Sequence, residues 1–366
     1  MDDVQRSVEA HIGAGVHGAA WLVDRAGDVT SGVAGRYGPV DEAIGPDTIF
    51  RISSVTKPVV AALAMVLVED GMLRLDDPVD ALLPELADRH VLRSPDSALT
   101  DTVPAERPIT VRDVLEFRTG LGMDFSGPFP GPVLGALAEL GLPVGPPAPQ
   151  QAPASDEWMR LVGSVPLSHQ PGSRWLYNTS AQLLGVLLGR ATGTPLDRLL
   201  AERLLDPLGM RDTGFVVHDL ARFGPQWMPD EVLYDPADGQ WATAPAFPDA
   251  AAGLVSTVAD LHAFANMLRS GGFPVLRPDT VALMTAPHVG PLDEAGREAW
   301  GLGLGVARLD LPDGRHAGTY GWDGGMGSTW WTDPVTDTVA ILLTTDAWSS
   351  PQPTPIFTEF WRVAFG

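Results

Sequence analysis

The segment FRISSVTKP, residues 50–58, contains the only lysine of the chain, Lys57, three residues after Ser54. The other 23 of the 24 basic residues are arginines. The apolar run PVVAALAMVLV (58–68) follows and predicts a helix that is buried on every side. Because helical residues three apart share a face, the spacing predicts that the side chains of Ser54 and Lys57 meet at the start of this helix.

This pair of residue types suits nucleophilic catalysis. A serine hydroxyl is a weak nucleophile until a base takes its proton. A lysine serves as that base if burial lowers its pKa from about 10.4 towards 7, whereas arginine does not deprotonate in proteins. The alternative is that Ser54 only caps the helix, because the pattern S-x-x-K is short and serine is a common N-cap.

Composition restricts the class of protein. Hydrophobic residues make up 45% of the 366 residues and the net charge is −22, which favours a globular protein and disfavours binding to nucleic acid or an anionic membrane. Cysteine is absent, and the eight histidines show no metal-ligand spacing, so we expect no metal and no cofactor. The start, MDDVQRSVEA, lacks the pattern of a signal peptide, and the longest apolar run is 11 residues against about 20 for a membrane span. We therefore expect a cytoplasmic protein of unknown oligomeric state.

The order of patterns predicts an α/β (α+β) fold. Two strands, 19–23 and 28–35, form a hairpin at the start. Helical patterns follow Ser54 and then occupy 77–87, 110–117, 156–163, 180–193, 195–209 and 256–272. Strands return at 301–309, 328–334 and 338–345, and a short helix at 355–365 closes the chain. We expect a mainly antiparallel sheet flanked by helices, formed by 1–75 plus 221–366, with a mostly helical inserted domain at 76–220 and the active site between them.

Two long segments are expected to line the binding pocket. They are the Pro- and Gly-rich loop within 121–153 and the segment RFGPQWMPDEVLYDP at 222–236. Trp227, Tyr234 and Trp241 either provide apolar contacts in this pocket or pack in the core.

Five motifs together resemble one known superfamily. They are FRISSVTKP, ITVRDVLEFRTGLG, PGSRWLYNTSAQLLGVLLGRATGTPL, LLDPLGMRDTGF and TYGWDGGMGSTWWTDP. In this order they resemble the serine β-lactamase and DD-peptidase superfamily, and most closely class C β-lactamases and family VIII carboxylesterases. The resemblance runs from about residue 5 to the C-terminus and implies a β-lactamase/transpeptidase-like fold.

The resemblance implies a role for each catalytic position. Ser54 is the acylated nucleophile and Lys57 its proton acceptor. Tyr177 matches the tyrosine that passes protons to the leaving group and later activates water; the alternative is a buried ring with no catalytic role. Thr179 stands where the family usually has asparagine, so Asn178 is the alternative for the amide contact to substrate.

The third family element, Lys-Thr-Gly in the lactamases, aligns with Trp322-Asp323-Gly324. The resemblance implies that these residues bind substrate, and that the backbone N–H groups of Gly325 and Ser54 form an oxyanion hole worth several kcal/mol. An ordinary hairpin turn is the alternative. The missing lysine disfavours β-lactam substrates, because a tryptophan does not hold a carboxylate as lysine does. Esterases of the family often carry tryptophan at this position.

These patterns predict a serine hydrolase that works through an acyl-enzyme, most simply a carboxylesterase acting on small esters. The alternatives are an acyltransferase that modifies a small metabolite, a β-lactamase or D-amino-peptide hydrolase, and a ligand-binding protein that keeps the fold without the chemistry. The expected partner is a small-molecule ester or amide substrate.

Overall fold

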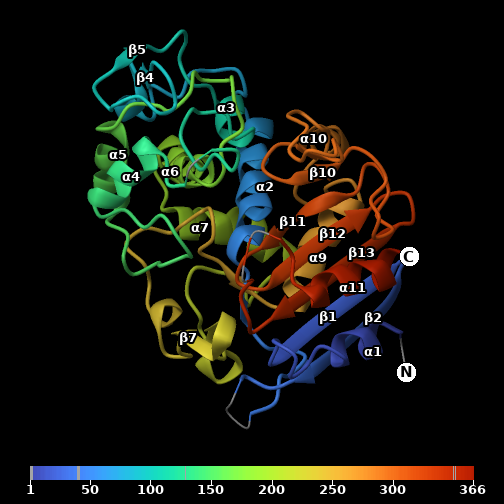
Figure 1. Ribbon diagram of the computed structural model, residues 1–366. Coiled ribbons are helices and arrows are strands. Elements are labelled where there is room, and N and C mark those ends of the chain that lie inside the picture. Colours follow the sequence, from blue (N-terminus) through green and yellow to red (C-terminus); the bar gives the residue numbers. More distant parts are fainter. Residues whose placement is uncertain (1–2, 39–41, 128, 349, 351) are drawn as a thin grey trace.

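A seven-stranded antiparallel sheet forms the larger part of the computed structural model, which describes residues 3–38, 42–127, 129–348, 350 and 352–366 (Figure 1). The strand order is β2-β1-β13-β12-β11-β10-β9. The strands are β1 (Gly18–Arg25), β2 (Asp28–Gly35), β9 (Glu298–Trp300), β10 (Gly305–Ala307), β11 (Tyr320–Gly324), β12 (Ser328–Asp333) and β13 (Thr338–Thr344). The predicted fold class is confirmed.

Helices cover both faces of this sheet. Helices α1 (Asp3–Glu9) and α11 (Pro355–Phe365) pack on one face, and α9 (Val258–Arg269) packs on the other. Alternate residues of one strand therefore enter different cores: Trp21 of β1 packs with Phe360 of α11, and Leu22 belongs to the core that contains Phe264 of α9. Burial on both faces explains why β13 (TVAILLT) has an unbroken run of buried residues.

The central helix α2 (Thr56–Glu69) lies between the sheet and a helical part of the chain (Figure 1). It is buried from Thr56 to Leu67 and packs against α6 and α10. The remaining helices are α3 (Val111–Leu115), α4 (Pro132–Glu139), α5 (Ser155–Gly163), α6 (Thr179–Thr192), α7 (Leu196–Leu200), α8 (Asp206–Leu208) and α10 (Pro278–Met284), with a π-helical turn (Ala201–Leu205) between α7 and α8.

Three short antiparallel strand pairs lie outside the main sheet. They are β3 (Phe50–Arg51) with β8 (Val255–Ser256), β4 (His90–Leu92) with β5 (Thr102–Pro104), and β6 (Gln226–Met228) with β7 (Val232–Asp235). The pair β3–β8 leads directly into the segment that contains Ser54. The division into 1–75 plus 221–366 and 76–220 stays a prediction.

Two local predictions were wrong. The segment 77–87 holds only a 3₁₀ turn (Pro84–Leu86), because proline lacks an N–H and disfavours helical geometry at the residue before it; Leu83 has φ −122° and ψ 70°. The loop predicted within 121–153 contains α4, which begins with Pro132 in its first turn, where proline is tolerated.

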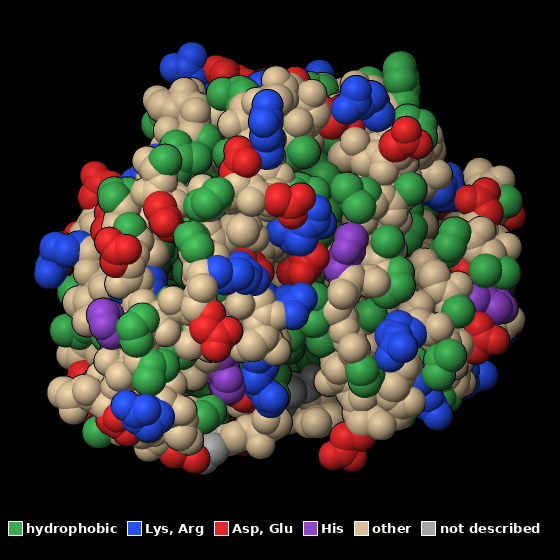
Figure 2. Space-filling model, turned by 90° about the horizontal axis from the view of Figure 1, so that it is seen from above, with side chains coloured by type: hydrophobic (Ala, Val, Ile, Leu, Met, Phe, Trp, Pro, Cys, Tyr) green, Lys and Arg blue, Asp and Glu red, His purple; other side chains and the backbone are tan. Residues whose placement is uncertain are grey.

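Two surface properties bear on the expected partners. In the described part of the chain, each helix is either too short or too polar to cross a bilayer. On the face seen from above, acidic and basic side chains are interspersed (Figure 2).

Candidate active site

Ser54 lies in a tight 3₁₀ turn (Ser53–Val55) that joins β3 to α2. Ser53 has φ 44°, in the left-handed region that most residues avoid. The turn is fixed through Ile52, whose carbonyl accepts a hydrogen bond of 2.6 Å from the Ser328 hydroxyl and whose N–H donates to the Leu254 carbonyl. These bonds to two distant segments hold Ser54 at the edge of a cavity, where it is 9% exposed.

Lys57 is buried in the first turn of α2, where its side chain is 1% exposed. Its Nζ donates to Ser54 Oγ at 2.8 Å and to the Ala251 carbonyl at 2.8 Å. Burial lowers the pKa of Lys57 to about 7, and the Asp249 carboxylate opposes this change. A substantial fraction of Lys57 is therefore a neutral amine at neutral pH, in hydrogen-bond contact with the serine hydroxyl.

Tyr177 lies against both of these residues. Its ring centroid is 4.5 Å from Lys57 Nζ, and its hydroxyl accepts a hydrogen bond of 2.9 Å from the indole N–H of Trp322. Burial raises the pKa of Tyr177 to about 12, while its hydrogen bonds with Ser54 and Trp322 oppose the rise. Tyr177 is therefore a neutral phenol at pH 7 that contacts the candidate nucleophile.

Asn178 and Thr179, which follow Tyr177, take different positions. Asn178 precedes α6 with φ 82° and lines the cavity. Thr179 begins the helix, and its side chain is 6% exposed. Of the two residues, Asn178 borders the cavity and Thr179 does not.

The end of β11 packs directly against the Ser54 turn. A Cβ atom at Gly324 would lie 2.5 Å from the Ile52 carbonyl oxygen and 3.1 Å from the Ser54 nitrogen, so only glycine fits. A Cβ at Gly325 would meet nothing within 4 Å. Gly324 therefore makes room for the nucleophile's own turn, and Gly325 borders open space. Across the described residues, the N–H groups of Ser54 and Gly325 donate to no other group, so both are available to an oxyanion.

Asp323 does not share the side of β11 that Trp322 occupies, because neighbouring strand residues point to opposite faces. Its Oδ1 accepts hydrogen bonds from Thr329 and from the Trp331 indole, the latter at 2.8 Å. Burial raises the pKa of Asp323, and the Arg315 guanidinium opposes the rise.

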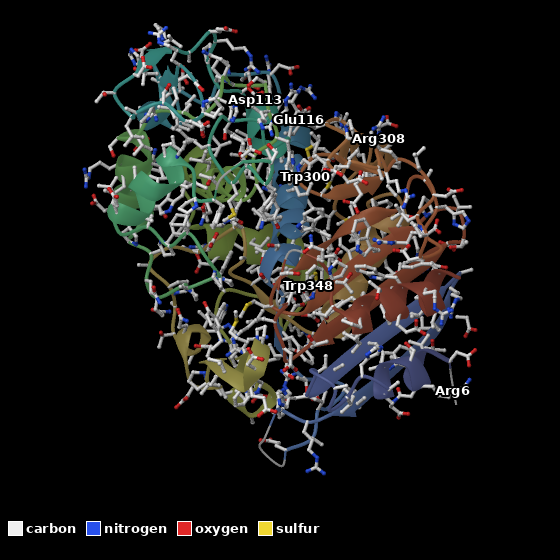
Figure 3. The ribbon with its side chains drawn as sticks, in the orientation of Figure 1. Arg6, Asp113, Glu116, Trp300, Arg308 and Trp348 are labelled. Carbon is white, nitrogen blue, oxygen red and sulfur yellow. The ribbon has the colours of Figure 1, made fainter. Side chains whose placement is uncertain are left out.

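A cavity of about 1180 Å³ is lined by Ser54, Tyr177, Asn178, Trp322, Asp323 and Gly325. Its lining residues come from both predicted parts of the chain and include many aromatic rings: Phe125, Trp158, Trp175, Tyr177, Trp322, Trp331, Trp348 and Trp361. The Trp322 ring contacts that of Tyr177 at 5.9 Å between centroids and, behind it, that of Trp300 at 4.7 Å. Trp300 and Trp348 are labelled in Figure 3, at the junction of the sheet and the helical part.

The two segments expected to line the pocket contribute unequally. The segment 121–153 supplies Met123, Phe125, Ala152 and much of 143–149, whereas 222–236 supplies Met228. The three aromatic residues singled out there serve packing: Trp227 donates to the Tyr37 carbonyl, Tyr234 to the Pro147 carbonyl, and Trp241 is fully buried and donates to the Gly253 carbonyl.

Sequence patterns missed the segment that accepts the second Lys57 hydrogen bond. Ala251 and Asp249 lie 194 and 192 residues after Lys57 in a stretch with no catalytic motif, FPDAAAG. The small, apolar residues of this stretch give no sequence signal, because the group that binds Lys57 is a backbone carbonyl. Among the described residues, no group of three or more His, Asp or Glu side chains is placed to hold a metal ion.

Comparisons with known proteins agree on one family. The family model described as Beta-lactamase matches residues 4–354. Protein Rv1367c of Mycobacterium tuberculosis is 34% identical over 322 residues, covering 81% of this chain and 77% of that protein. Esterase EstB of Burkholderia gladioli is 31% identical over 362 residues, covering 90% and 86%. The solved structure of EstCE1, described as a hydrolase with promiscuous acyltransferase activity, has a TM-score of 0.85 and 26% identity, covering 99% and 97%.

Proposed function

The chain belongs to the β-lactamase family and is a serine hydrolase, and on this premise we propose that it is a carboxylesterase acting on small esters through an acyl-enzyme at Ser54. One observation carries the proposal: Lys57 Nζ lies 2.8 Å from Ser54 Oγ, with burial lowering the pKa of Lys57 to about 7. A neutral amine in this position accepts the hydroxyl proton without help from a histidine.

Acylation follows from this geometry. Ser54 Oγ attacks the ester carbonyl while its proton passes to Lys57 Nζ. The negative charge that develops on the carbonyl oxygen is received by the free N–H groups of Ser54 and Gly325. Loss of one such donor typically costs about 2.7–4 kcal/mol in other hydrolases.

Tyr177 completes the proton path. Its hydroxyl contacts Ser54 and is held by the Trp322 indole N–H, and its ring lies against Lys57 Nζ, so we assign it the path from the protonated Lys57 to the departing alkoxide. The Lys57 proton moves through Tyr177 to the leaving alcohol. In deacylation the direction reverses: Tyr177 and Lys57 take one proton from water as it attacks the acyl group, and that proton passes to Ser54 Oγ as the bond between Ser54 and the acyl group breaks.

The charges around the cavity favour neutral substrates over anionic ones. Its lining includes six acidic residues, Asp249, Asp293, Glu298, Asp313, Asp323 and Glu359, against three arginines, Arg297, Arg315 and Arg362. Trp322, which stands where the lactamases have lysine, presents an aromatic face and an N–H already donated to Tyr177. The cavity therefore binds the carboxylate of a β-lactam less favourably than it binds a neutral ester. In this proposal Asn178 contacts a carbonyl or amide group of the ester.

Acyl transfer to an alcohol is the second candidate, and the size of the cavity favours it. A volume of about 1180 Å³ exceeds the range of about 300–1,000 Å³ that holds a drug-sized ligand, so an acceptor fits beside the acyl group. The same residues serve both reactions, because water and an alcohol attack the same acyl-enzyme.

The test is intact-protein mass spectrometry after exposure to activated esters, thioesters and β-lactams, followed by peptide mapping. We expect a fluorophosphonate probe and short-chain p-nitrophenyl esters to modify Ser54. A folded protein that is modified at another serine, or at none, contradicts the proposal. Added alcohol that diverts the acyl group to a new ester favours the acyltransferase candidate.

A further inference from the structure

A short chain of hydrogen bonds connects the candidate base to a carboxylate in the cavity wall. Lys57 Nζ donates to the Ala251 carbonyl at 2.8 Å, and the Ala251 N–H donates to Asp249 Oδ1 at 2.8 Å. Asp249 Oδ2 accepts from Gln182 Nε2 of α6 at 3.4 Å. Both ends of one peptide segment are therefore fixed, the carbonyl by Lys57 and the N–H by Asp249.

Asp249 is also the charge that acts on Lys57. Burial lowers the pKa of Lys57, and the Asp249 carboxylate is the charged group that opposes this. The reciprocal effect is present, since burial raises the pKa of Asp249 while the Lys57 ammonium and the Ala251 N–H oppose the rise. The other groups that face Lys57 are uncharged at neutral pH: the Ser54 hydroxyl and the Tyr177 ring.

The remaining elements around Lys57 bring no competing charge. From α6 the neighbour of Asp249 is the neutral Gln182. From β11, Asp323 acts on Tyr177 and on Glu298, and Lys57 is not among the groups it affects. Asp249 acts on Lys57 through its charge and is connected to it by hydrogen bonds through Ala251.

We propose that Asp249 is a positioning residue that holds the Ala251 carbonyl against Lys57 and sets the pH at which Lys57 becomes a base for Ser54. This inference rests on the proposed function, in which Lys57 takes the Ser54 proton. When that proton arrives, Lys57 becomes an ammonium ion in a buried site, and the Asp249 carboxylate stabilises the new charge until Tyr177 carries the proton to the leaving group. The proton count stays balanced, because Asp249 itself gains and loses none.

Substitution of Asp249 tests the effect of its charge while the hydrogen bond to the Ala251 N–H is kept. Asp249→Asn keeps an acceptor for the Ala251 N–H and removes the charge. Without the carboxylate, the ammonium form of Lys57 is less stable, so Lys57 titrates at lower pH by about one unit, the lower end of the effect of a nearby opposite charge. The acid limb of the pH profile moves down equally, and the plateau rate falls because a weaker base takes the proton. Asp249→Ser, with a short acceptor, is expected to do the same.

The single lysine of the chain makes a direct measurement possible. Growth with ¹³C-labelled lysine gives one side-chain Cε signal, that of Lys57, whose chemical shift against pH reports its titration. The rate of Ser54 phosphonylation by a fluorophosphonate probe, followed by intact mass at each pH, gives the functional profile. Glu359→Gln is the matched control, because it removes one carboxylate from the exposed rim of the same cavity, where Glu359 pairs with Arg362.

The expected result is a downward shift of about one pH unit in both readouts for Asp249→Asn and no shift for Glu359→Gln. If Ser54 is labelled but neither readout moves in Asp249→Asn, the inference is overturned and the proposed function stands. If wild-type Ser54 is not labelled at any pH, both are overturned. Should the variants not fold, the wild-type Lys57 signal decides: a second step at more acidic pH than the working range, where Asp249 takes a proton, supports the inference, and a single step overturns it.

Discussion

The indole N–H of Trp322 gives the sharpest test of the proton path, through the substitution Trp322→Phe. This change keeps an aromatic ring beside Tyr177 and removes the donor that lies 2.9 Å from its hydroxyl. While Tyr177 passes a proton, its oxygen carries partial negative charge, and a hydrogen bond to a charged group contributes about 1.5–3 kcal/mol. At about 1.4 kcal/mol per tenfold change in rate, kcat is expected to fall by about 10- to 150-fold.

Stopped-flow hydrolysis of a p-nitrophenyl ester separates the two half-reactions. We expect a burst of about one equivalent of p-nitrophenol in Trp322→Phe, followed by slow turnover, because deacylation by water depends on Tyr177 more than acylation by an activated ester does. Trp175→Phe is the matched control. The Trp175 ring centroid lies 5.6 Å from that of Tyr177, close to the 5.9 Å of Trp322, but the Trp175 indole N–H makes no hydrogen bond within the described structure. Equal losses in the two variants would refute the reasoning, since shape alone would then explain the effect of Trp322→Phe.

Four further predictions follow from the same site. Lys57→Arg is expected to hydrolyse esters as poorly as Lys57→Ala, because guanidinium does not deprotonate, and retained activity would indicate an electrostatic role instead. In the wild type, kcat/KM should fall tenfold per unit below about pH 7, since protonation of Lys57 near that pH removes the base; a rate that is constant down to pH 5 would contradict this. Gly324→Ala should slow labelling of Ser54 by about 100-fold or more, because the added Cβ would lie 2.5 Å from the Ile52 carbonyl oxygen. The Cβ of Gly325→Ala meets nothing within 4 Å, so this variant should be labelled much faster than Gly324→Ala, and equal labelling rates in the two variants would contradict the packing argument. A short-chain p-nitrophenyl ester should exceed benzylpenicillin in kcat/KM by about 100-fold or more, about 2.7 kcal/mol, and Trp322→Lys should narrow this difference; a wild-type preference for penicillin would contradict the esterase proposal.

The sequence predicted the centre of the site well because its parts are local. Ser54 and Lys57 are three residues apart, and the helix that begins just after Ser54 and carries Lys57 is specified by an apolar run that needs no distant information. β9 and β11 were missed, but the hairpin strands β1 and β2 and the late strands β10, β12 and β13 were predicted, because short runs between turn residues mark them. These elements depend on short-range patterns, so a single sequence contains the signal.

Long-range contacts were not predictable in the same way. The Trp322 indole reaches Tyr177 across 145 residues, and the Ala251 carbonyl reaches Lys57 across 194. A carbonyl contact is independent of residue type, so no composition marks it. Gly324 illustrates a subtler limit: the resemblance implied that it binds substrate, and the structure adds that its missing side chain leaves room for the Ser54 turn. Only the packing of two segments shows which neighbour a glycine accommodates.

The pairing of β1 with β13 has a consequence for how the protein is made. Ala20 of β1 lies opposite Leu343 of β13, so β1 pairs on this edge only after a strand that is synthesised more than 300 residues later. β12, which bears Ser328, pairs with the same late strand, and the Ser328 hydroxyl fixes the turn around the nucleophile. A nascent chain that stops before β13 therefore exposes two apolar strand edges and lacks a fixed nucleophile. Contacts between such distant residues also slow folding. We therefore expect hydrolytic activity only in chains that include β13.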